Sequence, residues 1–371
     1  MRILVAMDSF KGSLTSLEAG QSVKEGLLEA FAARTQAEGI PTSPHITVLP
    51  LADGGEGTVT ALAHGLGGTL RTVSVSGPLG PSHPVDATYA LLPGVTQAAA
   101  PLSASATPLA LMEIAQAAGL GLVPPTLRNP FLTTTYGVGQ LIADALAQGC
   151  RRFIIGLGGS ATNDGGMGML AALASVPDVA HATFRVACDV TNPLCGPKGA
   201  SAVFGPQKGA TPAQVALLDR CLYQWACHTN GLAHAQTPGA GAAGGLGYAF
   251  LHCLHGTLEP GVDLIMDAIR LESFLPQVDL VITGEGKMDG QTVMGKAPIG
   301  VARLAKKYGK RVIAFCGTAT PEATACLAAG IDAYYPLKTE GMPLAYAMEH
   351  AFSLLKEKVA AVSRTLIPRL S

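Results

Sequence analysis

The chain has 371 residues, of which 48% are hydrophobic and 14% charged, and its formal net charge is −1 at pH 7. This length predicts two domains with buried cores. The near-zero net charge excludes a broad basic surface of the kind that binds nucleic acids or anionic membranes. The eight Cys include no C-x-x-C pair, which favours neither a zinc site nor a disulfide framework. We therefore expect a cytoplasmic protein without membrane segment or nucleic-acid partner, whose oligomeric state the sequence leaves open.

The chain opens on the apolar run Ile3–Met7, which predicts a strand buried on both faces. A polar turn over 8–13 follows, and then a helix for which Thr15 or Ser16 is the predicted cap. The same order of elements recurs with a strand at 46–51, an acidic glycine-rich loop and a second helix. The first part of the chain is thus built from alternating strands and helices.

The middle of the chain changes character. Alternating apolar residues around a Gly/Pro-rich turn predict an antiparallel pair over 69–75 and 86–92. A second series of strands and helices follows, with strands at 153–157 and 184–188, and 238–247 is predicted as a loop inside it. Near residue 275 the style of the opening returns, with strands predicted at 278–283, 311–315 and 333–336 and a helix at 298–308.

Alternating strands and helices predict an α/β fold whose parallel sheets carry a site at the carboxyl ends of their strands. Because the two outer segments share one style, we predict a Rossmann- or flavodoxin-like domain built from 1–75 and 275–371. The second α/β domain, 76–274, is inserted between these segments.

Three acidic, glycine-rich loops directly follow predicted parallel strands, at 8–13, 53–57 and 284–291. Phosphoryl transfer needs backbone amides and Lys for phosphate oxygens, and carboxylates for Mg²⁺ or the attacking hydroxyl. One such loop is typical of an ordinary turn, because Asp and Gly favour turns. Three loops at one end of parallel sheets favour a phosphoryl-transfer site.

The loop over 156–166 lies between a predicted strand and an apolar helix. Its consecutive amides and the helix N-terminus predict an anion site. Residues Gly156–Ala161 also match G-x-G-x-x-A, so a nicotinamide-dependent dehydrogenase is an alternative. Against it, Asp178 and Asp189 are poorly placed for the acidic residue expected about 20 positions further on.

Residues Gly290–Ala297 almost match the P-loop pattern, but Ala297 lacks the hydroxyl that would bind Mg²⁺. Asp189 follows an apolar run and is either a general base or a turn residue. Three Lys beside Gly are candidate phosphate partners, although such residues are commonly solvated surface groups: Lys11, Lys208 and Lys287.

Taken together, the loops resemble those of the bacterial glycerate kinase family, type I glycerate 2-kinases. Six motifs stand in the family's order from the first residues to beyond residue 290: Asp8–Ser13, Pro50–Thr58, Gly156–Gly166, Cys188–Leu194, Phe204–Ala210 and Ile282–Thr292. The departures are small, with Lys287-Met288 in place of Arg and an aliphatic residue, and Gly290 in place of another small residue.

This resemblance implies ATP-dependent phosphorylation of D-glycerate with Mg²⁺, giving 2-phosphoglycerate in the catabolism of carbohydrate acids. It also implies an active site in the cleft between the two domains.

For a small anionic substrate we predict roles for single residues. Asp189 is expected to be the base or the orienting group for the attacking hydroxyl, and Lys11 is expected to neutralise the transferred group. Asp8, Asp53 and Asp164 are alternatives for the metal, with Asp53 and Asp164 preferred. The amides of 158–160 are expected to hold ATP phosphates or the substrate carboxylate. The groups expected to bind phosphate or substrate are Asp8, Ser9, Gly158, Gly159, Ser160, Asn163, Asn192, Lys208, Glu285, Asp289 and Gln291.

Overall fold

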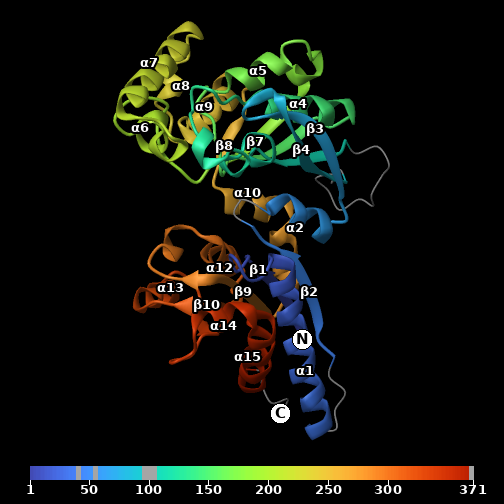
Figure 1. Cartoon of the computed structure of the whole chain (residues 1–371). Coiled ribbons are helices and arrows are strands. Elements are labelled where there is room, and N and C mark those ends of the chain that lie inside the picture. Colours follow the sequence, from blue (N-terminus) through green and yellow to red (C-terminus); the bar gives the residue numbers. More distant parts are fainter. Residues whose placement is uncertain (39–42, 53–56, 94–106, 367–371) are drawn as a thin grey trace. The chain divides into compact units, whose positions relative to one another are not determined.

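The computed structural model describes residues 1–38, 43–52, 57–93 and 107–366, in which the chain forms two compact units (Figure 1). The terminal unit comprises Met1–Asp53 and Ile265–Ser371, and the central unit comprises Gly54–Leu264. The predicted boundary near residue 75 would leave the strand that begins at Thr69 with the terminal unit. That strand is hydrogen-bonded along its length to the next one, and it therefore belongs with the central unit.

The terminal unit is built on a parallel five-stranded sheet of order β11-β10-β9-β1-β2. Its strands are β1 (Arg2–Met7), β2 (His45–Pro50), β9 (Leu280–Met288), β10 (Arg311–Ala319) and β11 (Ala333–Pro336). All five strands predicted for this part of the chain are confirmed. The middle strands are buried on both faces, which is why they read as continuous apolar runs in the sequence.

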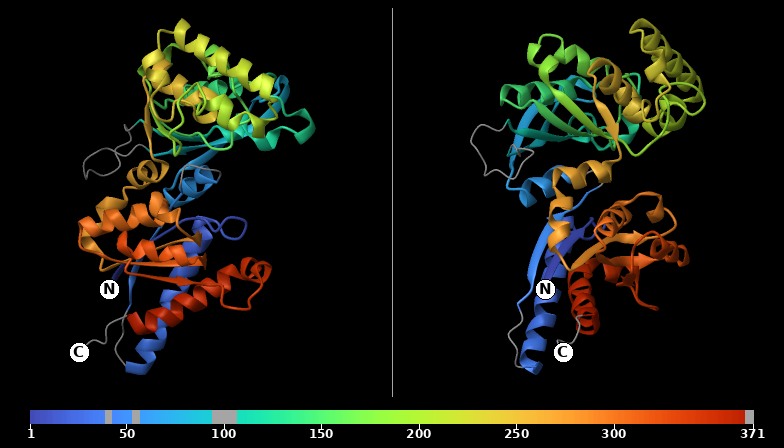
Figure 2. Two further views of the ribbon diagram at one scale, coloured as in Figure 1. Left: turned by 90° about the vertical axis from the view of Figure 1, so that its left-hand side faces the viewer. Right: turned by 180° about the vertical axis from the view of Figure 1, so that it is seen from behind.

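Two long helices of the terminal unit, α1 (Ser16–Glu38) and α15 (Ala351–Leu366), run side by side over one face of the sheet (Figures 1 and 2). Thr15 begins α1 with a capping box, because its Oγ1 accepts from the Glu18 N–H at 3.2 Å and the Glu18 carboxylate accepts from the Thr15 N–H at 2.8 Å. The other helical segments of this unit are α11 (Leu271–Phe274), η6 (Leu275–Gln277), η7 (Thr292–Met294), α12 (Ala297–Lys307), η8 (Pro321–Thr324), α13 (Ala325–Ala328) and α14 (Leu344–Glu349).

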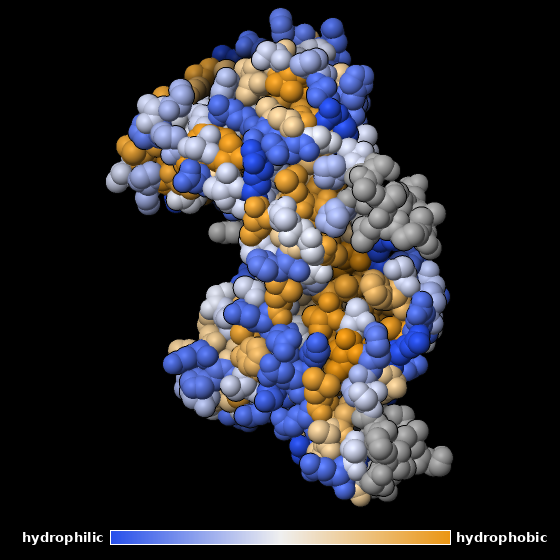
Figure 3. Space-filling view, turned by 90° about the vertical axis from the view of Figure 1, so that its right-hand side faces the viewer, coloured by the Kyte–Doolittle hydropathy of each residue, from blue (hydrophilic) through white to orange (hydrophobic). Residues whose placement is uncertain are grey.

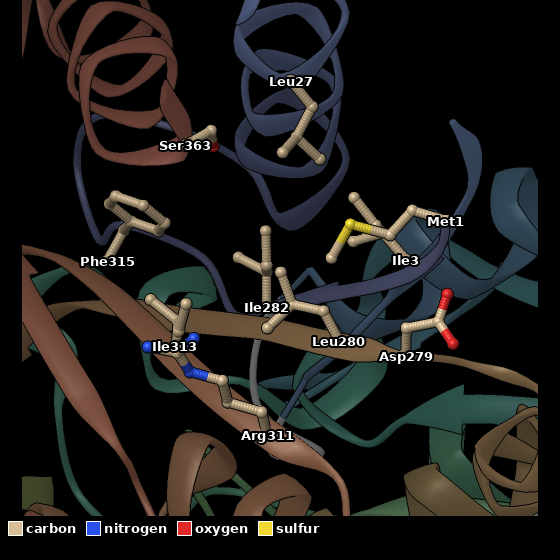
Figure 4. A pocket seen from close by; sticks show the side chains of 10 residues that line it. All are labelled: Met1, Ile3, Leu27, Asp279, Leu280, Ile282, Arg311, Ile313, Phe315 and Ser363. Atoms are coloured by element: carbon tan, nitrogen blue, oxygen red, sulfur yellow. The ribbon is translucent and has the colours of Figure 1, made fainter. Parts of the chain in front are cut away.

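A cavity of about 200 Å³ lies between the sheet and these two helices. Figure 4 shows Ile282 and Phe315 of the sheet directed toward Leu27 of α1 and Ser363 of α15. The lining of the cavity includes Met1, at the amino end of β1, so the cavity lies toward the edge of the sheet opposite to the polar loops described below.

The edge strand β2 is less covered than the middle strands. Its residues Ile46, Thr47 and Val48 are half-buried. Figure 3, which views the molecule from the side on which β2 lies in Figure 1, shows apolar residues among polar ones on this face.

The central unit has a mixed six-stranded sheet of order β3-β4-β5-β6-β7-β8. Its first three strands pair antiparallel and the last four pair parallel, as the predicted hairpin over 69–92 and the later strand–helix series require. The strands are β3 (Thr69–Gly77), β4 (Gly80–Leu92), β5 (Leu109–Glu113), β6 (Arg152–Gly156), β7 (Thr183–Ala187) and β8 (Thr257–Glu259).

Helices α4 (Tyr136–Ala147) and α5 (Met167–Leu173) pack closely against each other beside this sheet. A Cβ at Gly139 would lie 2.4 Å from the Met169 carbonyl oxygen, so this contact requires Gly. The remaining helical segments are α2 (Thr58–Gly65), α3 (Ala115–Ala118), η1 (Leu120–Leu122), η2 (Pro125–Leu127), η3 (Pro177–His181), α6 (Ala200–Phe204), η4 (Pro206–Lys208), α7 (Pro212–His228), α8 (Leu232–Ala235), α9 (Ala242–Tyr248), η5 (Ala249–Cys253) and α10 (Gly261–Ala268), which crosses into the terminal unit.

The fold is therefore α/β with two sheets, as predicted. The loop predicted over 238–247 is wrong in its second half, because α9 begins at Ala242. The helix is irregular there, with Ala243, Gly244 and Gly245 in the left-handed region. Within the described ranges, no helix combines the length and the apolar character needed to cross a membrane.

Candidate active site

In the terminal unit, two polar loops meet at the carboxyl ends of β1 and β9. These strands are parallel neighbours, with Met7 opposite Gly284, and the Asp8 N–H donates to the Gly284 carbonyl at 2.9 Å. A Cβ at Gly286 would lie 3.1 Å from the Cα of Phe10 and 3.3 Å from the backbone nitrogen of Lys11. The loop that carries Lys11 therefore lies against the strand end that carries Glu285.

Glu285 is the buried carboxylate of this cluster, with 6% of its surface exposed. Its Oε1 accepts from the hydroxyl of Thr292 at 2.6 Å, and its Oε2 lies 3.8 Å from Lys296 Nζ. Burial raises the pKa of Glu285, and the hydrogen bond from Thr292 and the charge of Lys296 offset only part of that rise.

Asp289 is the second carboxylate of the cluster. Its Oδ1 accepts from the Gln291 N–H at 2.9 Å, and its two oxygens lie 3.2 Å from Lys287 Nζ and 3.6 Å from Lys296 Nζ. Burial acts to raise the pKa of Asp289, but the hydrogen bonds from Lys287 and Gln291 and the charge of Lys296 outweigh it and lower the pKa. Lys296 thus lies within 4 Å of both carboxylates.

Sequence reasoning missed Lys296, although it lies in the near-P-loop match Gly290–Ala297 that was set aside. The residue directly precedes α12, whose first residue is Ala297. Although the segment does not fit the P-loop pattern, the Lys just before the predicted helix was the signal that could have identified Lys296.

Two further predicted residues lie on the loop after β1. Asp8 is half-buried, and its Oδ1 accepts from the Ser9 N–H at 2.7 Å. Lys11 is exposed. Asp53, the other predicted metal ligand of this part of the chain, lies outside the described residues.

The carboxylates of the terminal unit fit a Mg²⁺ ion that is also bound by phosphate. Within the described ranges, no group of three or more His, Cys, Asp and Glu side chains could hold a metal by itself. Protein sites for Mg²⁺ commonly supply one or two carboxylates, with waters and substrate phosphates completing the octahedron. Glu285 and Asp289 provide that number of carboxylates beside the exposed Lys287 and the half-buried Lys296.

In the central unit, the predicted anion loop follows β6. The carbonyl of Gly159 accepts from the Leu120 N–H at 2.7 Å, and the Ala161 N–H donates to the Ala118 carbonyl at 2.8 Å, which ties the loop to the segment after β5. Among the described residues, the amides of Gly158, Gly159 and Ser160 find no hydrogen-bond partner. These amides are therefore available to a ligand.

Lys208 is buried against this loop and is hydrogen-bonded to it. Its Nζ donates to Ser160 Oγ at 2.8 Å and to the Thr162 carbonyl at 2.7 Å, and only 2% of the residue is exposed. No carboxylate of the described residues forms an ion pair with it. Burial lowers the pKa of Lys208 to about 7, against the opposing effect of the Asp164 charge.

Asp164 uses both carboxylate oxygens to fix neighbouring helices. Oδ2 accepts from the N–H and the hydroxyl of Thr135, each at 2.8 Å, and Oδ1 accepts from the Gly166 N–H at 3.1 Å. Thr135 and Gly166 directly precede α4 and α5. These hydrogen bonds favour a structural role for Asp164, and its assignment to a metal stays a prediction.

Asn163 is buried beside this loop and donates from Nδ2 to Ser201 Oγ at 2.9 Å. Within the described part of the chain, its Oδ1 and the Thr162 hydroxyl are buried without a hydrogen-bond partner. A Cβ at Gly244 would lie 2.0 Å from the Thr162 carbonyl oxygen. Gly244, which lies in the segment predicted as a loop over 238–247, therefore packs directly against the backbone of the anion loop.

Asp189 lies beyond the end of β7, which is the parallel neighbour of β6, with Ala187 opposite Gly156. The Asp189 side chain is exposed, and its Oδ1 accepts from the Gly261 N–H at 2.8 Å at the start of α10. Asn192 donates to the Lys198 carbonyl at 2.8 Å. The candidate base and the anion loop thus come from the same edge of one sheet.

The structure does not give the Gly156–Ala161 segment the geometry of a dinucleotide fingerprint. In that fingerprint the helix begins within the glycine motif, so that its N-terminus meets the pyrophosphate. Here α5 begins only at Met167, and Asp164 occupies its first amides. The helix N-terminus predicted to complete the anion site is therefore not part of it.

Sequence reasoning also missed Glu113, which is 3% exposed at the end of β5. Its Oε1 accepts from the Val59 N–H at 2.8 Å and its Oε2 from the Gly57 N–H at 3.3 Å, so it fixes the start of α2. The available signal was an apolar run ending on an acidic residue, the same pattern that identified Asp8 and Asp189.

Comparisons with known proteins identify the family of the chain and a solved structure of similar fold. A sequence model described as "Glycerate kinase family" matches residues 3–177 and 174–367. The chain is 40% identical to "Glycerate kinase" of Bacillus subtilis, over 99% of this chain and 98% of that protein. It is 38% identical to "Glycerate 2-kinase" of Escherichia coli, over 100% and 98% of the two chains. A crystal structure from Salmonella typhimurium LT2 described under the name glycerate kinase 2 has 39% identity and a TM-score of 0.83, covering 99% of this chain and 98% of that one.

Proposed function

The chain belongs to the glycerate kinase family, and from this premise we propose that it transfers the γ-phosphate of ATP to the 2-hydroxyl of D-glycerate. It is a kinase that acts on glycerate. The full-length match to the family carries this conclusion, and a nicotinamide-dependent dehydrogenase has no support from it. The 2-position, the D-configuration, the cytoplasmic location and an active site between the two domains stay predictions.

In our proposal, the cluster of the terminal unit handles the phosphates. A triphosphate carries several negative charges, and Lys11, Lys287 and Lys296 offer separate cations near the carboxyl ends of β1 and β9. Lys11 is exposed, so its flexible side chain can reach the group being transferred. Glu285 and Asp289 would hold Mg²⁺, which would neutralise part of the negative charge of the phosphates.

Asp189 is proposed to orient the attacking hydroxyl and to accept its proton. The contact with the Gly261 N–H fixes one carboxylate oxygen at the start of α10. The exposure of the side chain allows a substrate hydroxyl to approach it. Positioning of the hydroxyl for in-line attack is the main task left to the protein in phosphoryl transfer.

The direct test is incubation of the purified protein with ATP, Mg²⁺ and D-glycerate, with the product identified by phosphorus NMR. We expect 2-phosphoglycerate. A 3-phosphoglycerate signal would retain the kinase and overturn the position, and unchanged glycerate with folded protein would contradict the function itself. L-glycerate is the matched control for the configuration.

A further inference from the structure

We propose that the loop Gly158–Ser160, with Lys208 behind it, is the subsite that binds the carboxylate of glycerate, an inference that rests on the proposed function. The terminal unit would then hold the nucleotide phosphates alone. The loop that binds each substrate can be tested separately from the reaction itself, because a wrong subsite changes the KM that is affected and a wrong reaction gives no turnover.

Lys208 forms no ion pair with a carboxylate of the described chain. A buried ammonium group is costly unless an anion or several hydrogen bonds compensate for its lost hydration. Lys208 has two neutral acceptors, Ser160 Oγ and the Thr162 carbonyl, and no ion pair with a described carboxylate. Asp164 acts on it only through longer-range attraction. The site therefore has positive potential that a ligand can satisfy.

The loop that contacts Lys208 also offers a row of backbone N–H donors. The amides of Gly158, Gly159 and Ser160 have no partner in the described structure, and Gly159 reaches its left-handed backbone (φ 72°) as only Gly does readily. Consecutive amides of this kind bind anionic oxygens. The hydroxyl of Ser160 accepts from Lys208, so its own proton is free to point at the same oxygen.

The number of positive charges at the loop favours a carboxylate over a polyphosphate as its ligand. One buried cation and a short row of amides match a single negative charge, whereas a triphosphate requires several cations and a metal. Adjacent strands lie about 4.8 Å apart, a distance comparable with the length of a three-carbon acid. A carboxylate bound by the loop after β6 would place the hydroxyls of glycerate at the same edge of the sheet as Asp189, which follows the neighbouring strand β7.

The test is steady-state kinetics of Lys208→Met, which keeps an unbranched apolar side chain of nearly the same length and removes the charged ammonium group. We expect KM for D-glycerate to rise roughly 100-fold, as for the loss of one partner of a buried charged pair, while KM for ATP changes less than about threefold. Arg220→Met, an exposed site on α7, is the matched control for loss of one positive charge in the same unit, and we expect wild-type constants.

Thermal unfolding separates this role from a structural one. Because Lys208 forms no ion pair with any residue that the structure describes, Lys208→Met should unfold at the wild-type temperature or above it. If the variant does not fold, the inference is tested by Ser160→Ala, which should raise KM for glycerate roughly tenfold without changing KM for ATP.

A rise in KM for ATP with unchanged KM for glycerate would place phosphate at this loop and overturn the inference while the kinase activity stands. Unchanged constants for both substrates in a folded variant would also overturn it. Absence of turnover in the wild-type protein would instead contradict the proposed function.

Discussion

The two units present their lysines in opposite ways. In the terminal unit, Lys287 is exposed and Lys296 is half-buried, and both are paired with carboxylates at 3.2 to 3.8 Å. In the central unit, Lys208 is buried, donates to neutral oxygens and has no ion pair among the described residues.

This difference has a physical meaning for binding. Exposed lysines keep their charge and their mobility, and they suit an extended polyphosphate that must arrive and leave with a metal. A buried lysine with fixed acceptors is preorganised for one small anion, because the cost of desolvating it is already included in the folded state. The following predictions would break or sharpen this comparison, in order of decreasing effect.

The largest effect is expected for Asp189→Asn in the central unit. Removing the proposed proton acceptor should lower kcat by about 10³-fold, the middle of the range for general base catalysis, with KM for both substrates changed much less. The amide keeps an oxygen for the Gly261 N–H, so the fold should be retained. An unchanged kcat would remove Asp189 from the reaction, and a change in KM alone would make it a binding group.

Lys296→Met tests the terminal unit. We expect kcat/KM for ATP to fall by about 10²-fold, because the lysine that lies between Glu285 and Asp289 would no longer balance their charges or contact phosphate. KM for glycerate should stay near the wild-type value. Lys307→Met, at the exposed end of the same helix, is the matched control. A selective effect on glycerate would reverse the comparison between the units.

The pH dependence of KM sharpens the contrast, because only one of these lysines is buried. The pKa of Lys208 is lowered from its ordinary value of 10.5 to about 7, so the free enzyme loses this charge as the pH rises above about 7. Carboxylate binding above that pH must take up a proton, and KM for glycerate should rise up to about tenfold per pH unit. Lys208→Met should show a higher KM that lacks this dependence. A flat wild-type profile between pH 6 and 9 would contradict the assignment.

The smallest effect is expected for Thr292→Val. The hydroxyl of Thr292 donates to Glu285 at 2.6 Å and accepts from the Asp289 N–H at 3.0 Å, so its loss should destabilise the fold by about 1–3 kcal/mol. Burial already raises the pKa of Glu285, and loss of this donor should raise it further, which moves the acidic limb of the kcat profile to higher pH. Chemical denaturation and a pH–rate profile measure the two effects. Thr292→Ser, which keeps the hydroxyl, should restore both.

The sequence by itself determined most of the secondary structure and the identity of the loops. Buried parallel strands are nearly continuous apolar runs, and Asp or Gly at their ends predicts turns at the carboxyl edge, so the loops after β1, β6, β7 and β9 could be found by pattern. The order of six such motifs also identified the family, because that order does not depend on three-dimensional contacts.

Only the tertiary structure decided which of these polar residues are available to a ligand. Asp164, Glu113 and Lys208 each read as isolated polar residues in the sequence. The carboxylates of Asp164 and Glu113 accept backbone N–H groups. Lys208 is instead buried beside Ser160, in a loop whose amides have no hydrogen-bond partner among the residues that the structure describes. Whether a side chain binds backbone, another charge or a substrate depends on segments distant in the chain, such as Gly244 packed against Thr162. Local sequence carries no record of such contacts, since burial and hydrogen bonding are set by packing between elements.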